Sequence, residues 1–204
     1  PLLDEHKAAI FVVIDCLRLD QWRVLEPILQ QYFDVETAHY FSILPTATPY
    51  ARNALFSGLF PCEIAGNYPD WWGERDDESL NAHERQLLEA QLKELGVALP
   101  VRYDKISNAA DADDLERRIP SIIAPEGVSA FVFNFVDLLT HGRSESQILY
   151  EVARDEIALR QITKQWFQRS ALFSLLKEAS RRKVSVLLTT DHGSIHCNTP
   201  ATVF

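Results

Sequence analysis

The distribution of apolar residues predicts three buried strands, each followed directly by an aspartate. Each run is apolar at successive positions and rich in β-branched residues, which is typical of a strand covered on both faces in a parallel sheet. The runs and the carboxylates that follow them are Ala8–Ile14 with Asp15, Val128–Val136 with Asp137, and Val184–Thr190 with Asp191. Weaker signals predict two further strands, at Val35–Ser42 and Gly96–Tyr103.

Helical periodicity fills the intervals between these strands. Leucines at helical spacing follow Ser79 and stop before Gly96, a residue suited to the end of a helix. A long amphipathic helix is predicted from Ile148 to Trp166, Ser170 is placed to cap another, and Asp70–Glu78 is predicted to be a polar loop. This alternation indicates an α/β fold with a mostly parallel central sheet and helices on both faces. No flexible linker interrupts the sequence, so the whole chain is predicted to form one domain.

The three aspartates are expected to meet at one edge of the sheet. The carboxyl ends of parallel strands share an edge, and ligands of open α/β sheets bind there. Asp15, Asp137 and Asp191 would repel one another strongly at that edge, and a bound cation is the usual compensation. The pattern therefore favours a metal site.

Two histidines add to this site. Asp191-His192-Gly193 follows a strand directly, and the step from Asp137 to His141 allows both side chains onto one face of a helical turn. Carboxylate and imidazole ligands together suit Zn²⁺ or Mn²⁺. A single Asp–His pair is more often a surface turn or a structural histidine, but two pairs beside Asp15 reverse that preference.

A hydroxyl-bearing segment supplies a candidate nucleophile. Thr48 followed by Pro49 is typical of a helix start, with the threonine at the N-cap, and the helix-forming stretch stops at Gly58. The hydroxyl would lie where the helix N-terminus favours an anion. The alternative is capping alone, which is far commoner, and the neighbouring metal ligands make the nucleophile hypothesis competitive.

Composition narrows the class of protein. The 204 residues are 47% hydrophobic and carry 20 Lys and Arg against 29 Asp and Glu, a formal charge of -9. This acidity argues against binding of bulk nucleic acid, although a metal could still hold a small anionic substrate. Three cysteines without a C-x-x-C pair fit a reducing compartment, and no apolar run is long enough for a membrane span, so we expect a cytoplasmic location.

Taken together, these motifs resemble those of the alkaline phosphatase superfamily. Its pattern is an Asp after the first strand, a Ser or Thr that opens a helix, Asp-x-x-x-His, Asp-His-Gly and a later His. The Pro-Thr-x-Thr stretch, with Gly58 ten positions after Thr48, looks like the nucleophile segment of the nucleotide pyrophosphatase and phosphodiesterase branch. Over nearly its whole length the chain is similar to PglZ-type domains, above all those at the carboxyl end of response regulators of type IX secretion in Bacteroidetes.

The resemblance implies two Zn²⁺ ions, with Mn²⁺ as an alternative. Asp15, Thr48, Asp191 and His192 would hold one ion, and Asp137 and His141 the other. The superfamily's late His has no secure match, because His196 lies too close to the Asp-His-Gly turn. We expect that ligand beyond Phe204, which would make the domain incomplete at its carboxyl end.

The implied activity is hydrolysis of nucleotide-type phosphodiesters, with Thr48 as the nucleophile. Arg18, Arg52 and Asn67 could contact the phosphate, although both arginines also fit ordinary salt bridges. A phosphomonoesterase or phosphotransferase on the same metals is a second enzyme hypothesis. A slow signalling or interaction module that keeps the fold and metals is an alternative of another class. The resemblance also implies a receiver domain in the natural chain, a homodimer, and a sigma factor and secretion-machinery proteins as partners.

Overall fold

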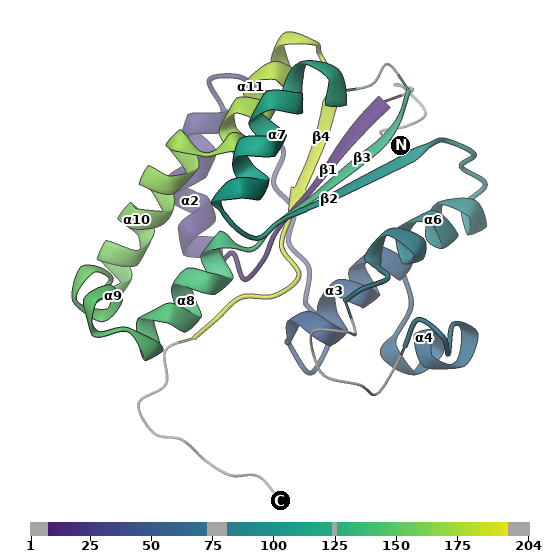
Figure 1. Ribbon diagram of the computed structural model, residues 1–204, viewed down its shortest axis with the longest axis horizontal. Helices are drawn as coiled ribbons and strands as arrows, with labels where there is room; N and C mark the ends of the chain where they lie inside the picture. Colours follow the sequence, from purple (N-terminus) through teal and green to yellow (C-terminus); the bar gives the residue numbers. More distant parts are fainter. Residues whose placement is uncertain (1–7, 73–80, 124–125, 196–204) are drawn as a thin grey trace, which may run out of the picture.

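A computed structural model describes residues 8–72, 81–123 and 126–195. This part of the chain contains a four-stranded parallel sheet in the order β2-β3-β1-β4 (Figure 1). The strands are β1 (Ala8–Ile14), β2 (Val101–Ile106), β3 (Gly127–Phe133) and β4 (Ser185–Thr189). The predicted α/β fold with a parallel sheet is therefore confirmed.

Side chains alternate between two cores because successive residues of a strand point to opposite faces. Val12 and Phe131 belong to the larger core, whereas Val13 and Val132 belong to the smaller core on the other face. All four side chains are at most 1% exposed. A strand buried on both faces has to be apolar throughout, and this is the pattern that the sequence contains.

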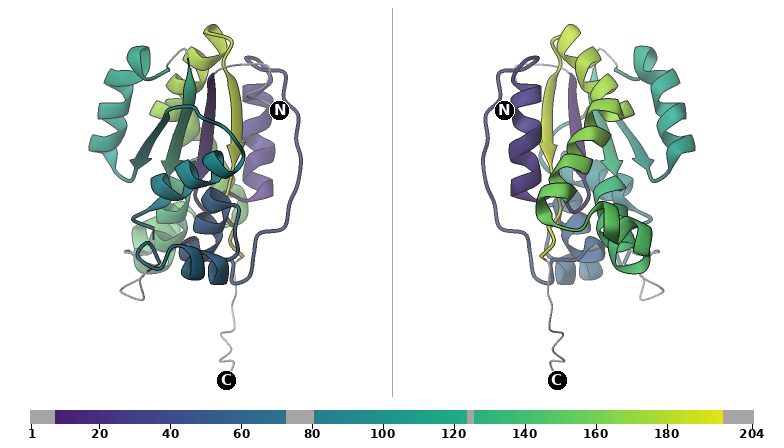
Figure 2. Two further views of the ribbon diagram at one scale, coloured as in Figure 1. Left: turned by 90° about the vertical axis from the view of Figure 1, so that its right-hand side faces the viewer. Right: turned by 90° about the vertical axis from the view of Figure 1, so that its left-hand side faces the viewer.

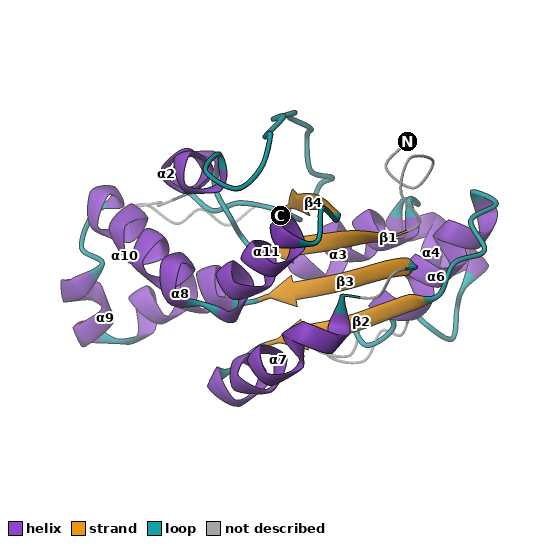
Figure 3. Ribbon diagram, turned by 90° about the horizontal axis from the view of Figure 1, so that it is seen from above, coloured by secondary structure: helices purple, strands orange, loops and turns teal. Residues whose placement is uncertain are grey.

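Helices cover both faces of the sheet (Figures 2 and 3). One group packs against the larger core and another against the smaller core, and two further helices lie beyond the carboxyl ends of the strands. The helices on the larger core are α2 (Leu19–Leu29), α7 (Ala109–Ile122), α10 (Glu156–Arg169) and α11 (Ala171–Arg181). The helices on the smaller core are α3 (Thr48–Ser57), α4 (Pro61–Asn67) and α6 (Glu84–Glu94). The two helices beyond the strand ends are α8 (Phe135–Glu145) and α9 (Gln147–Val152). Within the described ranges, no helix has both the length and the apolar content that a membrane span requires.

The strand predicted at Val35–Ser42 is not formed. This segment runs along the edge of the molecule (Figure 2), and a cavity of about 780 Å³ is lined by this segment and β4. Side chains hold the segment instead of a backbone ladder. The Tyr40 hydroxyl donates to the Thr190 carbonyl, and Ser42 Oγ donates to the Asp191 carbonyl at 2.6 Å.

The boundaries of three other predicted strands shift. The strand predicted at Gly96–Tyr103 begins only at Val101 and continues to Ile106, and the last strand ends at Thr189. The run Val128–Val136 divides, because β3 ends at Phe133 and α8 begins at Phe135. The apolar residues after Phe133 are equally compatible with a strand or a buried helix, so periodicity alone could not locate this boundary.

The predicted long helix over residues 148–166 is wrong in its extent. It divides at Ala153 into α9 and α10, and the Asp155 side chain caps α10 by accepting from the Ala158 N–H at 2.8 Å. The predicted cap at Ser170 is confirmed, since its Oγ accepts from the Phe173 N–H at 3.2 Å. Leu80 and most of the loop predicted at Asp70–Glu78 lie outside the described residues.

Candidate metal and phosphoester site

The segments that follow β1 and β4, with the first turn of α8 after β3, deliver the candidate carboxylate and imidazole ligands to one edge of the sheet. The register pairs Ile14 of β1 with Phe133 of β3, and Val13 with Thr189 of β4, so these strands end at nearly the same level. The Asp15 N–H still donates to the Phe133 carbonyl at 3.0 Å, which fixes the backbone of this aspartate at the end of the ladder.

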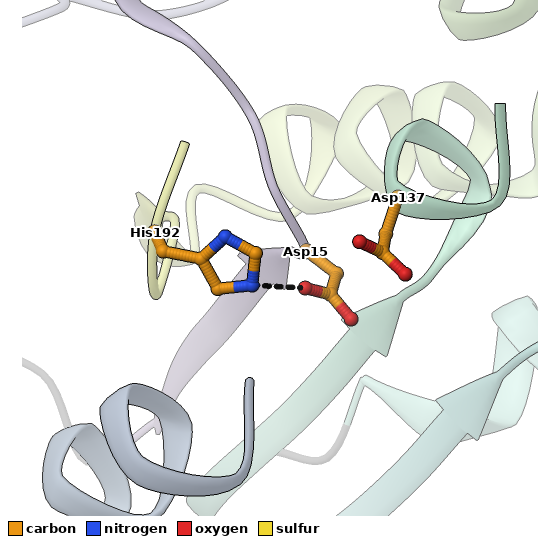
Figure 4. Close-up of side chains that lie close together, drawn as sticks. All are labelled: Asp15, Asp137 and His192. Carbon is orange, nitrogen blue, oxygen red and sulfur yellow. Dashed lines mark ion pairs between the residues drawn. The ribbon is translucent and has the colours of Figure 1, made fainter. Parts of the chain in front are cut away.

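Asp15, Asp137 and His192 form the centre of the site. Each offers one ligand atom, and these atoms lie within 4.8 Å of one another (Figure 4). Nε2 of His192 lies 3.4 Å from Oδ1 of Asp15. Asp15 and His192 are buried, and Asp137 is partly buried in the first turn of α8, where it was expected to follow a strand directly. The helix places its carboxylate beside Asp15.

Asp191 lies directly behind this group. Its Oδ1 accepts hydrogen bonds from the backbone N–H groups of Cys16 and His192, at 3.3 and 2.9 Å. Its Oδ2 is buried and has no hydrogen-bond partner among the described residues, although it lies 3.8 Å from an Arg52 nitrogen. Burial, with the nearby charge of Asp15, raises the pKa of Asp191 to about 6. A buried carboxylate oxygen without a donor is a position where a cation would be favourable.

His141 lies at the outer rim of the site. It follows Asp137 by one turn of α8, and its Nε2 is 3.4 Å from Oδ1 of Asp137. The His141 side chain is 71% exposed. Burial, followed by the charge of Asp15, raises the pKa of Asp137. His141 therefore adjoins the central group through Asp137.

Thr48 does not have the predicted N-cap position. Ala47 is the N-cap of α3, and Thr48 is the first helical residue, with Pro49 after it. Its hydroxyl faces the acidic edge, since Oγ1 lies 2.9 Å from Nε2 of His192 and 3.4 Å from Oδ1 of Asp15. The expected helix end is confirmed, because Gly58 is the C-cap with a φ of 69°. Interactions with site residues, and not capping, account for the position of the Thr48 hydroxyl.

His192 is oriented by its own backbone. Its Nδ1 lies 3.1 Å from the Gly193 carbonyl, which can only accept, so Nδ1 carries a proton and Nε2 faces Asp15 and Thr48. Burial opposes the imidazolium, but contacts with Cys16 and the charge of Asp191 outweigh it and raise the pKa of His192 to about 9. This orientation leaves Nε2 as the atom that could ligate a metal.

Of the three candidate phosphate-binding residues, the two arginines form salt bridges and Asn67 is exposed. Arg18 is bonded through Nη2 to Asp20 at 2.9 Å and also pairs with Glu156. Arg52 forms a buried salt bridge and is only 1% exposed, so it is shielded from substrate, and the salt-bridge alternative describes it. Asn67 is the exposed last residue of α4.

Sequence reasoning missed Glu84 and Tyr103. Glu84 Oε1 accepts from Arg52 Nε at 2.6 Å, and the Tyr103 hydroxyl donates to the other Glu84 oxygen. Neither residue lies in a recognisable motif. Only their convergence on Arg52, from α6 and β2, indicates their connection to the site.

The donor set fits a divalent metal ion. Carboxylates, one imidazole nitrogen with a fixed orientation and a hydroxyl converge at one edge, and Asp191 adds a buried oxygen without a donor. These ligand types suit Zn²⁺ or Mn²⁺. Such a site can polarise a hydroxyl and stabilise the charge of a phosphoryl group.

A parallel α/β sheet with carboxylates, an imidazole and a hydroxyl at its carboxyl edge agrees with an alkaline phosphatase-like domain, a class of phosphoester hydrolase folds, and the family comparison shows this class. The model of one family, described as the BREX system PglZ alkaline phosphatase-like domain, matches residues 1–203, and the chain belongs to this family. No curated protein matches the chain.

Proposed function

We propose that this domain is a metal-dependent hydrolase of phosphoesters and that its preferred substrates are nucleotide-type phosphodiesters. The observation that carries the proposal is the position of the Thr48 hydroxyl. It is directed at His192 and Asp15 and is not used as a helix cap. The choice of diesters follows from the resemblance of the Thr48 segment to the nucleotide pyrophosphatase and phosphodiesterase branch.

Two Zn²⁺ ions are proposed as cofactors, with Mn²⁺ as the alternative. Asp15, Thr48, Asp191 and His192 would hold one ion, and Asp137 with His141 would contribute to the other. When bound, the metals would lower the pKa of the Thr48 hydroxyl and neutralise charge on the phosphoryl and leaving oxygens. The proximity of Asp15, Asp137 and His192, within 4.8 Å, supports a metal site at this edge, and the division between two ions follows from the resemblance to the alkaline phosphatase superfamily.

The chemistry assigned to Thr48 is nucleophilic displacement at phosphorus. Thr48 Oγ1 loses its proton to solvent and forms a bond to phosphorus, while the bond from phosphorus to the leaving alcohol breaks. Water then cleaves the phosphothreonine, which releases a phosphomonoester and restores the hydroxyl. The N-terminus of α3 favours phosphoryl oxygens beside Thr48 because its first N–H groups carry partial positive charge.

The biological context proposed here follows the finer resemblance, which is to the carboxyl-terminal domain of the response regulator PorX. We expect a cytoplasmic output domain that follows a receiver domain and forms a homodimer. The expected partners are a sigma factor and components of the secretion machinery. A slow signalling module would share these partners, and measured turnover distinguishes it from an efficient hydrolase.

The deciding experiment combines metal analysis with a substrate screen on the purified domain and on two Thr48 variants. Thr48→Ser keeps the hydroxyl, and Thr48→Val keeps the shape without it. We expect bound Zn²⁺ or Mn²⁺, faster hydrolysis of bis(p-nitrophenyl) phosphate than of p-nitrophenyl phosphate, measurable activity in Thr48→Ser, and a loss of about 100-fold or more in Thr48→Val. Near-native turnover by a folded, metal-loaded Thr48→Val would exclude Thr48 as the nucleophile.

A further inference from the structure

A buried chain of polar residues runs behind the candidate metal site. Arg52 of α3 lies between Asp15 and Glu84, and all three residues are 1% exposed. Its Nη1 donates to Asp15 Oδ2 and its Nε donates to Glu84 Oε1, each at 2.6 Å. Tyr103 of β2 then donates its hydroxyl to the second oxygen of Glu84. The chain links two strands and two helices to one carboxylate.

This arrangement gives the two carboxylate oxygens of Asp15 different partners. Oδ2 is held by Arg52, whereas Oδ1 faces Nε2 of His192 and the hydroxyl of Thr48, each at 3.4 Å. A carboxylate with one anchored oxygen cannot rotate freely. Its other oxygen therefore remains directed at the site.

We propose that Arg52 is a positioning residue that presents Oδ1 of Asp15 to a bound divalent metal, and that Glu84 and Tyr103 hold Arg52 in place. The proposal rests on the metal site of the proposed function, but not on its substrate or nucleophile. Partners that orient a ligand typically alter metal affinity by about 10- to 100-fold. Arg52 suits this task because its planar guanidinium bonds two carboxylates in fixed directions.

A simpler role would be charge balance. Arg52 is a cation among buried carboxylates, including Asp191 at 3.8 Å, and any cation at this position would reduce their repulsion. The two roles differ in what they require of the side chain. Charge balance needs only a positive charge, whereas positioning needs the guanidinium geometry, so Arg52→Lys separates them.

The test measures the dissociation constant for Zn²⁺ by chelator competition, without substrate, in the wild type, Arg52→Lys and Tyr103→Phe. Arg85→Lys is the matched control, because Arg85 is an exposed arginine of α6 paired with Glu89. We expect Arg52→Lys to bind Zn²⁺ about 10- to 100-fold more weakly, Tyr103→Phe to bind more weakly by a smaller factor, and Arg85→Lys to be unchanged. Thermal unfolding in EDTA shows whether each variant is folded.

Native affinity in a folded Arg52→Lys would overturn the proposal in favour of charge balance. If Arg52→Lys does not fold, Tyr103→Phe decides, because this change keeps the ring that packs on Phe56 and removes the hydroxyl that bonds Glu84. Weaker Zn²⁺ binding by Tyr103→Phe then supports the proposal that Glu84 and Tyr103 hold Arg52 in place, and unchanged Zn²⁺ binding overturns it. A wild type that binds Zn²⁺ but hydrolyses no phosphoester would refute the proposed function while leaving the affinity comparison decisive for Arg52.

Discussion

At the scale of single residues, the site depends on side chains whose two polar atoms have different partners. One oxygen of Asp15 accepts from Arg52 and the other faces His192 and Thr48, whereas the two ring nitrogens of His192 face the Gly193 carbonyl and Thr48. Asp191 uses one oxygen for backbone N–H groups and keeps the other without a hydrogen bond. One atom of each residue sets the orientation, and the other is left for chemistry.

Glu178, far from the site, provides a pH test at the same scale. Hydrogen bonds from Arg181, and then from Arg182, lower the pKa of Glu178 to about 2 from its usual 4.5. Because the folded-state pKa is depressed, the stabilisation is complete above about pH 4.5 and is lost as the pH falls towards 2. We predict that Glu178→Gln lowers the thermal midpoint near neutral pH and that its difference from wild type shrinks between pH 4.5 and 2.

Thermal melts across this pH range check the prediction. Glu89→Gln is the control, because Glu89 has a single exposed partner, Arg85, and such pairs contribute little. A difference for Glu178→Gln that stays constant down to pH 2 would show that these arginines do not stabilise the carboxylate in the folded state.

At the scale of elements, helix α3 connects the site with the smaller core. It begins at Thr48, carries Arg52 one turn later, buries Phe56 and ends at Gly58. The 3.6-residue period places Thr48, Arg52 and Phe56 along one side of the helix, at successive turns. One short helix therefore supplies the candidate nucleophile, the arginine proposed to position Asp15, and a buried aromatic residue of the smaller core.

The end of α3 can be tested by substituting Gly58. Its φ of +69° is unfavourable for residues with a Cβ, and an added Cβ would lie 2.6 Å from Nε2 of Gln91, an atom at the end of a flexible side chain. We predict that Gly58→Ala reduces the free energy of unfolding by about 1–2 kcal/mol, measured by urea denaturation. Most of this cost would come from the backbone, because Gln91 can move.

Gly66 provides the matched control for this substitution. It lies inside α4, and an added Cβ would meet no atom within 4 Å. Gly66→Ala should therefore increase the free energy of unfolding by about 0.5–1 kcal/mol. If both substitutions change stability equally, the left-handed backbone at Gly58 is not the cause.

At the scale of the whole molecule, two cores hold the strands whose carboxyl ends form the site. The larger core secures α2, α7, α10 and α11, and the smaller core secures α3, α4 and α6. Since α3 carries Thr48, the smaller core also fixes the distance between this hydroxyl and the ligands that follow β1 and β4. Damage to that core should therefore affect stability and the site together.

Phe56 tests the contribution of the smaller core to stability. It is fully buried and makes edge-to-face contacts with Phe11 and Tyr103, with ring centroids 5.6 and 5.8 Å apart. We predict that Phe56→Ala lowers the free energy of unfolding by about 3–5 kcal/mol. Phe41→Ala, at a fully exposed position, should change it by less than about 0.5 kcal/mol. Denaturant unfolding of both variants checks the contrast, and similar losses would contradict the core assignment.

Local pattern was sufficient for part of this architecture. Strands buried on both faces must be apolar throughout, so β1 and β3 and the aspartates near their ends could be predicted from the chain alone. The strand β4 was also predicted, but as a buried strand, whereas it lies at the edge of the sheet and its residues are only partly buried or exposed. Parallel pairing then required those ends to share an edge, which predicted a convergent acidic site. The helix stop at Gly58 and the cap at Ser170 were predictable because each depends on neighbouring residues only.

Only the tertiary structure decided the features that depend on distant partners. Whether Val35–Ser42 formed a strand depended on its position relative to β4, and a cavity is lined by both segments. The division between β3 and α8 depended on tertiary packing, which the hydrophobic pattern of the sequence does not specify. The Thr48 hydroxyl faces His192 because two segments 144 residues apart meet at the sheet edge. Glu84 bonds Arg52, and Tyr103 bonds Glu84 and packs on Phe56; such contacts between remote segments leave no periodic signal in the sequence.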